Sequence, residues 1–145
     1  MKNAKRGDTN AMYELGILYN IGQSGLSKDL KLGYEWFQKS ADNGNMRGML
    51  GAGDSLIHGL GVNNDVKYGI ALVCQAAGLG HATACFMVGK FYGYGRFGLP
   101  INISQAIYWL KKGASDDCPY QVGSASQKDS ARLLLKELQS NLESN

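Results

Sequence analysis

The stretch Gly16-Ile17-Leu18-Tyr19-Asn20-Ile21-Gly22 places a tyrosine between two glycines, at intervals of three residues. The same pattern recurs 73 positions later at Gly89, Tyr92 and Gly95, and a weaker copy, Gly53-Leu56-Gly59, lies between the two. Self-similarity with a period of 36 to 37 residues is typical of solenoids, in which each repeat is a small helical unit. The motif therefore predicts an all-α chain of about three helix-turn-helix repeats.

Aligning the copies predicts repeats at residues 7–43, 44–79 and 80–116 of a single domain, 1–145. In each repeat a first helix is expected to end at a glycine, because glycine readily adopts the left-handed conformation of a helix C-cap. A second helix is expected to begin after a residue whose side-chain oxygen can accept a hydrogen bond from the first helical turn. These caps are Gly22, Gly59 and Gly95 for the first helices, and Asp29, Asp65 and Asn102 for the second helices.

Small residues recur at matching places on both helices of each repeat. A glycine inside a helix costs about 1 kcal/mol relative to alanine, so three copies at one position predict close contact between the paired helices. The small positions are Gly16, Gly53 and Gly89 on the first helices, and Gly33, Gly69 and Ala106 on the second. Large residues expected to fill the space beside them are Trp36, Leu72 and Trp109. An ordinary helical bundle with chance glycines is the alternative.

The first repeat reads Ala11…Leu15-Gly16…Tyr19…Gly22…Asp29…Trp36…Lys39-Ser40-Ala41…Gly44. This pattern resembles that of Sel-one-like repeats, relatives of tetratricopeptide repeats, and the resemblance covers about 110 of the 145 residues. The second repeat departs from it, with Leu56 and Leu72 where the family has tyrosine and tryptophan. The resemblance implies a right-handed α-solenoid. It also implies a scaffold in complex assembly, protein quality control or signalling.

The two ends of the chain depart from the repeat. Residues 2–6 align with the last turn of a second helix and are interpreted as the remnant of a preceding helix, which suggests a fragment or descendant of a longer array. Residues 117–124 are expected to form a linker. A helix over about 126–142 is predicted to start at a capping box formed by Ser126 and Asp129. Its apolar side would cap the solenoid or, alternatively, dock a partner; it consists of Ala131, Leu134, Leu135, Leu138 and Leu142.

The first helices leave one side free, which the family resemblance implies is the concave surface of the solenoid. Residues separated by three, four and three positions, such as Asn10, Tyr13, Ile17 and Asn20, are expected to share that side of a helix. The candidate partner-binding residues are Asn10, Tyr13, Ile17, Asn20, Arg47, Leu50, Asp54, Ile57, His58, Phe86, Lys90 and Tyr94, and Thr83 and Gly93 occupy equivalent positions. Aromatic, aliphatic and charged residues together suit a peptide or protein segment. The alternative is that Leu50 and Phe86 pack between neighbouring helices and that the charges form surface pairs.

Composition excludes several other classes of function. The net charge is +3 with scattered basic residues, which gives no argument for nucleic acid, and the concave positions lack a base-reading pair in each repeat. No apolar run reaches about 18 residues, so no membrane insertion is expected. An odd number of cysteines, Cys74, Cys85 and Cys118, and no apolar leader favour a reducing, cytoplasmic compartment.

No catalytic residue, metal ligand or cofactor is predicted. His81 and Cys85 have a spacing that can hold a metal, but no second pair lies near them, and a packing role is favoured. Cysteine-rich relatives to which β-lactam binding or hydrolysis is attributed carry cysteines eight residues apart. The corresponding pairs here are Ala41 with Met49 and Ala77 with Cys85, so the staple is missing. A β-lactam-handling enzyme and a structural fragment of a longer array remain the alternatives to a scaffold.

Overall fold

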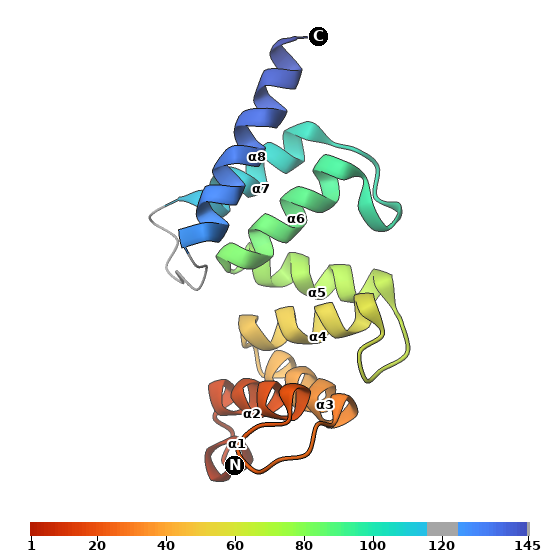
Figure 1. Cartoon of the computed structure of the whole chain (residues 1–145), viewed down its shortest axis with the longest axis vertical. Helices are drawn as coiled ribbons and strands as arrows, with labels where there is room; N and C mark the ends of the chain where they lie inside the picture. Colours follow the sequence, from red (N-terminus) through yellow and green to blue (C-terminus); the bar gives the residue numbers. More distant parts are fainter. Residues whose placement is uncertain (116–124, 145) are drawn as a thin grey trace. The chain divides into compact units, whose positions relative to one another are not determined.

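The computed structural model describes the backbone of residues 1–115 and 125–144, and the predicted linker at 117–124 lies outside it. These residues form helices joined by turns and loops, with no strand among them (Figure 1). The elements are α1 (Lys2–Lys5), α2 (Thr9–Ile21), α3 (Leu30–Asp42), α4 (Met46–His58), α5 (Val66–Gly78), α6 (Ala82–Tyr94), the short 3-10 helix η1 (Arg96–Gly98), α7 (Ile103–Ala114) and α8 (Ala125–Glu143).

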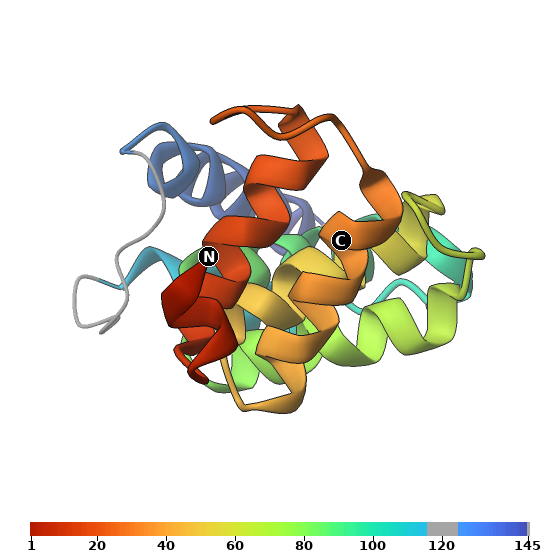
Figure 2. The same cartoon turned by 90° about the horizontal axis from the view of Figure 1, so that it is seen from below.

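The chain forms two compact units, Met1–Gln75 and Ala76–Asn145. In the first unit α2 packs against α3, and α3 packs against α4, and Figure 2 shows α2 and α3 side by side from below. The single domain and the repeat boundaries drawn from the sequence stay predictions. None of the described helices is long and apolar enough to cross a lipid bilayer.

The helices begin and end where side-chain caps and glycines dictate. Asp29, Asp65 and Asn102 each accept a hydrogen bond from a backbone N–H three residues on, at 3.0, 3.1 and 3.0 Å. Gly22, Gly59 and Gly95 each end a first helix in the left-handed conformation, which a side chain would disfavour. All six predicted caps are therefore confirmed.

The small residues bring paired helices into backbone contact, as predicted. A β-carbon added to Gly53 on α4 would lie 2.8 Å from the carbonyl oxygen of Gly69 on α5, and one added to Gly69 would lie 2.7 Å from that of Gly53. A β-carbon on Gly16 would lie 3.1 Å from the carbonyl oxygen of Gly33. Real β-carbons do not approach backbone as closely as 2.7 or 2.8 Å, so α4 and α5 can pack at this distance only because positions 53 and 69 are both glycine.

The residue that fills the space beside the glycines differs from the one predicted. Phe37 is 2% exposed and its ring lies where a β-carbon on Gly16 would lie, at 2.6 Å, whereas Trp36 is half-buried. Adjacent helical positions point about 100° apart, so only one of them can face the glycines. Trp36 packs instead against the cluster of Ala4, Met12 and Leu15. The equivalents of Phe37, Val73 and Leu110, are likewise fully buried.

The one-turn helix α1 packs onto the start of the first unit. Its Ala4 is buried against Met12 and Leu15 of α2, as the alignment of residues 2–6 with the end of a second helix predicts. In the equivalent position Ala41 at the end of α3 is also buried. α1 therefore covers the side of α2 that would otherwise expose apolar surface.

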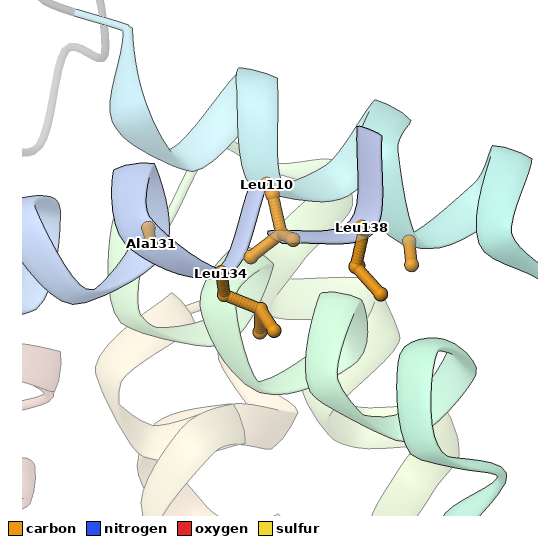
Figure 3. Close-up of a cluster of buried hydrophobic side chains, with 5 residues drawn as sticks. Leu110, Ala131, Leu134 and Leu138 are labelled. Carbon is orange, nitrogen blue, oxygen red and sulfur yellow. The ribbon is translucent and has the colours of Figure 1, made fainter. Parts of the chain in front are cut away.

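In the second unit α8 packs against α7 and contacts α6. Ala106 and Leu110 of α7 form a buried cluster with Ala131, Leu134 and Leu138 of α8, and Figure 3 shows Leu134 and Leu138 beneath Leu110. The predicted capping helix is confirmed, but Leu142 lies outside its packed side and is 51% exposed. Side chains of residues 125–128, and with them the predicted capping box, lie outside the described part.

Candidate functional site

Arg47 of α4 is the centre of the candidate surface in the first unit. Its Nη1 lies 3.7 Å from Oε1 of Glu14 on α2, and its Cζ lies 5.8 Å from the centroid of the Tyr13 ring. The Tyr13 ring in turn contacts Phe37 of α3, with 5.6 Å between ring centroids. We call Tyr13, Glu14 and Arg47 the Tyr13–Arg47 cluster. It joins a half-buried aromatic side chain to charged groups at the surface.

The environment of Tyr13 keeps its hydroxyl protonated. Burial raises the pKa of Tyr13 above its ordinary value of 10.0, the nearby Glu14 carboxylate raises it further, and Arg47 opposes both. At neutral pH the phenol is therefore a neutral hydrogen-bond donor and acceptor. A half-buried tyrosine beside an arginine is the kind of pair that anchors protein partners.

Asn45 fixes the start of α4 against the start of α2. Its Nδ2 donates to Oδ1 of Asn10 at 2.8 Å and to Oγ1 of Thr9 at 3.1 Å. Its Oδ1 accepts from the backbone N–H groups of Arg47 and Gly48. Asn10, a predicted site residue, is thus exposed but already engaged at this junction.

Ile17, Leu50, Asp54 and His58 lie near the same surface. Ile17 and Leu50 are half-buried, and Nε2 of His58 lies 3.4 Å from Oδ1 of Asp54 one turn earlier on α4. Both members of this pair are well exposed. The candidate surface thus includes one half-buried aliphatic residue on each of α2 and α4 and one exposed charged pair on α4.

Two of the predicted site residues, Asn20 and Ile57, point toward the second helices. Ile57 is 4% exposed, and its side chain lies 2.8 Å from where a β-carbon on Gly69 of α5 would be. Asn20 fills the equivalent place beside Gly33 of α3. The reason is the rotation of the helix. Asn20 and Ile57 each come ten residues after the first candidate position of their helix, and at 3.6 residues per turn ten residues fall about 80° short of three full turns. Their side chains therefore no longer lie on the open side.

In the second unit the predicted residues have divided roles. Phe86 is half-buried against the cluster formed by α7 and α8, so part of its ring serves packing. The Nζ atom of Lys90 lies 5.3 Å from the Phe86 ring centroid. Tyr94 at the end of α6 is 48% exposed, and Cζ of Arg96 lies 5.8 Å from its ring centroid. Gly93 lies against Leu138 and Ala106, and Thr83 is half-buried.

His81 and Cys85 serve the start of α6. The Nδ1 atom of His81 accepts from the backbone N–H of Ala84 at 3.4 Å, and Sγ of Cys85 donates to the carbonyl oxygen of Ala77 at 3.4 Å. His81 thus takes the capping role that Asp8 and Asn45 have on α2 and α4. Within the part that the structure describes, no group of three or more potential ligands could hold a metal ion.

The Cys74 thiol is expected to react slowly with a thiol reagent. It is half-buried on α5, and burial raises the pKa of Cys74 above its ordinary value of 9.0. At pH 8 the thiolate fraction, which is the reactive form, is therefore smaller than in free cysteine. In a Cys118→Ser variant, Cys74 should react with DTNB several-fold more slowly than free cysteine, with a rate that rises with pH. A rate equal to that of free cysteine would contradict the described burial.

Comparison with known proteins places this geometry in a family. The Sel1 repeat model matches residues 9–45, 47–81 and 82–118, and each match begins within a residue of the start of α2, α4 or α6. A Sel1 repeat protein from Oxalobacter formigenes has a similar crystal structure, with a TM-score of 0.68 and 25% identity over 73% of this chain and 41% of that one. A protective antigen with an SLR fold, present in uropathogenic Escherichia coli strains, has a TM-score of 0.57 at 22% identity over 94% of this chain and 39% of that one, which shows the fold alone.

Two longer proteins share sequence with this chain. The chitin synthase regulator SKT5 of Saccharomyces cerevisiae is 28% identical over 113 residues, 76% of this chain and 16% of that protein. The ERAD-associated E3 ubiquitin-protein ligase component HRD3A of Arabidopsis thaliana is 38% identical over 58 residues, 40% of this chain and 9% of that protein. The chain thus spans less than a fifth of the length of either relative. Matches that cover most of its residues, together with paired helices in contact through glycines, show that the chain belongs to the Sel1 repeat family, an all-α class of helix-turn-helix solenoids.

Proposed function

We propose that this chain is a non-enzymatic adaptor that binds a peptide or protein segment along the open side of its first helices. The observation that carries the proposal is the Tyr13–Arg47 cluster, in which a half-buried ring and a guanidinium lie together at the surface of α2 and α4. The names of the two relatives, a regulator of one enzyme and a component of another, support an adaptor role.

The make-up of the surface favours a polypeptide over a small molecule. Tyrosine and arginine are enriched among the residues that dominate the energy of protein interfaces. Here they are flanked by the half-buried Ile17 and Leu50, which offer apolar contact, and by the exposed pair Asp54–His58, which offers charge. An extended segment presents apolar and polar side chains in alternation, and this surface can receive both.

A purely structural role for the cluster makes a different prediction. An exposed ion pair such as Arg47–Glu14, at 3.7 Å, contributes about 0 to 1 kcal/mol to folding. If Arg47 served folding alone, its removal would lower stability slightly and leave any binding unchanged. Binding and stability therefore separate the two roles.

The test starts from peptides selected against the wild-type protein from a random phage-displayed library. We expect the double variant Tyr13→Ala/Arg47→Ala to bind the selected peptides at least about tenfold more weakly in fluorescence anisotropy, because anchor residues typically contribute more than about 1.4 kcal/mol each. The matched control is Lys67→Ala/Tyr68→Ala, which removes a basic residue and a tyrosine from the exposed side of α5. Unchanged affinity in a folded Tyr13/Arg47 variant, or equal loss in the control, would refute the proposal.

The non-enzymatic part of the proposal has its own check. The cysteine positions of the β-lactam-handling relatives are Ala41, Met49, Ala77 and Cys85 here, so one cysteine stands where they have four. We expect no turnover of nitrocefin above the buffer rate. Hydrolysis that copurifies with the folded protein and disappears on a substitution in the Tyr13–Arg47 cluster would overturn the adaptor assignment.

A further inference from the structure

The charge of residues 66–115 is one-sided. From Val66 to Ser115 the sequence contains no aspartate or glutamate, but it contains Lys67, Lys90, Arg96, Lys111 and Lys112. Four of these five basic residues belong to the second unit. In the first unit acidic and basic residues are interspersed along the chain. Helices α6 and α7 therefore carry basic residues and no carboxylate of their own.

Two of these basic residues, Lys90 on α6 and Arg96 in η1, each lie over an aromatic ring of α6. Phe86, Lys90 and Tyr94 are spaced by four residues, so they lie one above another on the helix. Nζ of Lys90 lies 5.3 Å from the Phe86 ring centroid, and Cζ of Arg96 lies 5.8 Å from that of Tyr94. We call Phe86, Lys90, Tyr94 and Arg96 the basic-aromatic row.

The turn after α6 holds Arg96 in place. Phe97 has a positive φ of 56°, which is uncommon for a bulky residue, and its ring packs edge-on against the buried Phe91 at 5.2 Å. Ile101 lies against Gly95 and is 66% exposed. The row therefore ends at a turn anchored by one aromatic contact, with Ile101 as an exposed apolar side chain beside it.

The first unit carries different charges at the equivalent places. Lys90 corresponds to Ile17 in the first repeat and to Asp54 in the second, where the carboxylate is paired with His58. Among the described residues no ion pair involves Lys90 or Arg96, and on α8 Asp129 is paired with Arg132. Because no carboxylate in the described part of the chain pairs with Lys90 or Arg96, a ligand that brings carboxylates gains charge-assisted hydrogen bonds without breaking any ion pair described there.

We propose that the basic-aromatic row binds an acidic segment of a partner protein, in which aspartate or glutamate alternates with apolar residues. Carboxylates would meet Lys90 and Arg96, and apolar side chains would contact Tyr94 and Ile101. The inference rests on the proposed adaptor function and names the chemistry of the partner. Single-stranded RNA fits less well, because bases need open ring faces and one face of both Phe86 and Tyr94 is already covered by a cation.

The test measures binding of three labelled probes by fluorescence anisotropy. The first is a peptide of alternating glutamate with leucine and phenylalanine, the second has lysine in place of glutamate, and the third is single-stranded oligouridine. We expect the acidic peptide to bind the wild type and to lose about tenfold or more in affinity for Lys90→Glu/Arg96→Glu, since like charges then face each other. The lysine peptide should gain affinity for the same variant, and a higher salt concentration should weaken both complexes.

Lys31→Glu/Lys67→Glu is the matched control, because it reverses two exposed lysines of the first unit and should leave binding of the acidic peptide within about twofold. Should charge reversal unfold the second unit, Lys90→Gln/Arg96→Gln gives the same comparison in a milder form. Tighter binding of oligouridine than of the acidic peptide, or no binding of the acidic peptide, overturns the inference. If the affinity of the phage-selected peptides depended on Tyr13 and Arg47 but not on Lys90 and Arg96, the inference about the basic-aromatic row would be overturned and the proposed adaptor function would stand.

Discussion

Replacing Phe37 with alanine is expected to lower the free energy of unfolding of the first unit by about 3 to 5 kcal/mol. The ring is 2% exposed and lies between Gly16 on α2 and Gly51 on α4, where added β-carbons would contact it at 2.6 and 2.9 Å. It also supports the Tyr13 ring. Its removal leaves a cavity lined by glycines, and backbone that lacks side chains cannot repack to fill it. Urea unfolding monitored by far-ultraviolet circular dichroism measures the loss.

The neighbouring tryptophan is the control for Phe37→Ala. Trp36 has a larger side chain but is half-buried, and Nζ of Lys39 covers its ring at 4.9 Å from the centroid. We expect Trp36→Ala to cost under about 2 kcal/mol, because part of the ring is already in water. If Trp36→Ala proved more damaging than Phe37→Ala, the second helix would have to be rotated by about one residue from the described packing.

Replacing Gly53 with valine is expected to destabilise the first unit by about 3 kcal/mol. The new β-carbon would meet the carbonyl oxygen of Gly69 and the side chain of Val73, each at 2.8 Å. Neither α4 nor α5 can keep its present position, because the Gly69 oxygen belongs to the backbone of α5. The better helix propensity of valine recovers a few tenths of a kcal/mol at most. The same urea titration measures the effect.

Gly78 is the matched control for Gly53→Val. It is the last residue of α5, and no atom lies within 4 Å of where its β-carbon would be. Gly78→Ala is therefore expected to be neutral or to stabilise by up to about 1 kcal/mol, since alanine has the higher helix propensity. Equal losses for Gly53→Val and Gly78→Ala would show that glycine matters here for reasons other than close helix contact.

The sequence predicts the features of this fold that depend on a residue and its near neighbours. The glycine caps at Gly22, Gly59 and Gly95 and the side-chain caps at Asp29, Asp65 and Asn102 are local, and all were confirmed. The choice between Trp36 and Phe37 is not local, because it depends on the angle at which a second helix faces the glycines. Both residues are large and apolar, and the more distinctive one was mistaken for the buried one.

Prediction of the candidate surface had the same limit. Tyr13 and Arg47 lie together as expected, but helical rotation carries Asn20 and Ile57 toward the second helices. Phe86 packs partly against the cluster formed by α7 and α8, and the sequence of α8 does not follow the repeat. Glu14 and Asn45 were missed, although a signal for Asn45 exists: Asp8, Asn45 and His81 each directly precede a first helix and have side chains that can cap it.

The glycine contact between α4 and α5 also bears on how new specificity could arise. The two helices meet through carbonyl oxygens and backbone atoms, which are common to every sequence that keeps glycine at positions 53 and 69. Other side chains of α4, such as those of Arg47 and Leu50, take no part in that contact. Such surface side chains can therefore be replaced by mutation or design while α4 and α5 keep their packing. The same pair of helices can then present many different recognition surfaces.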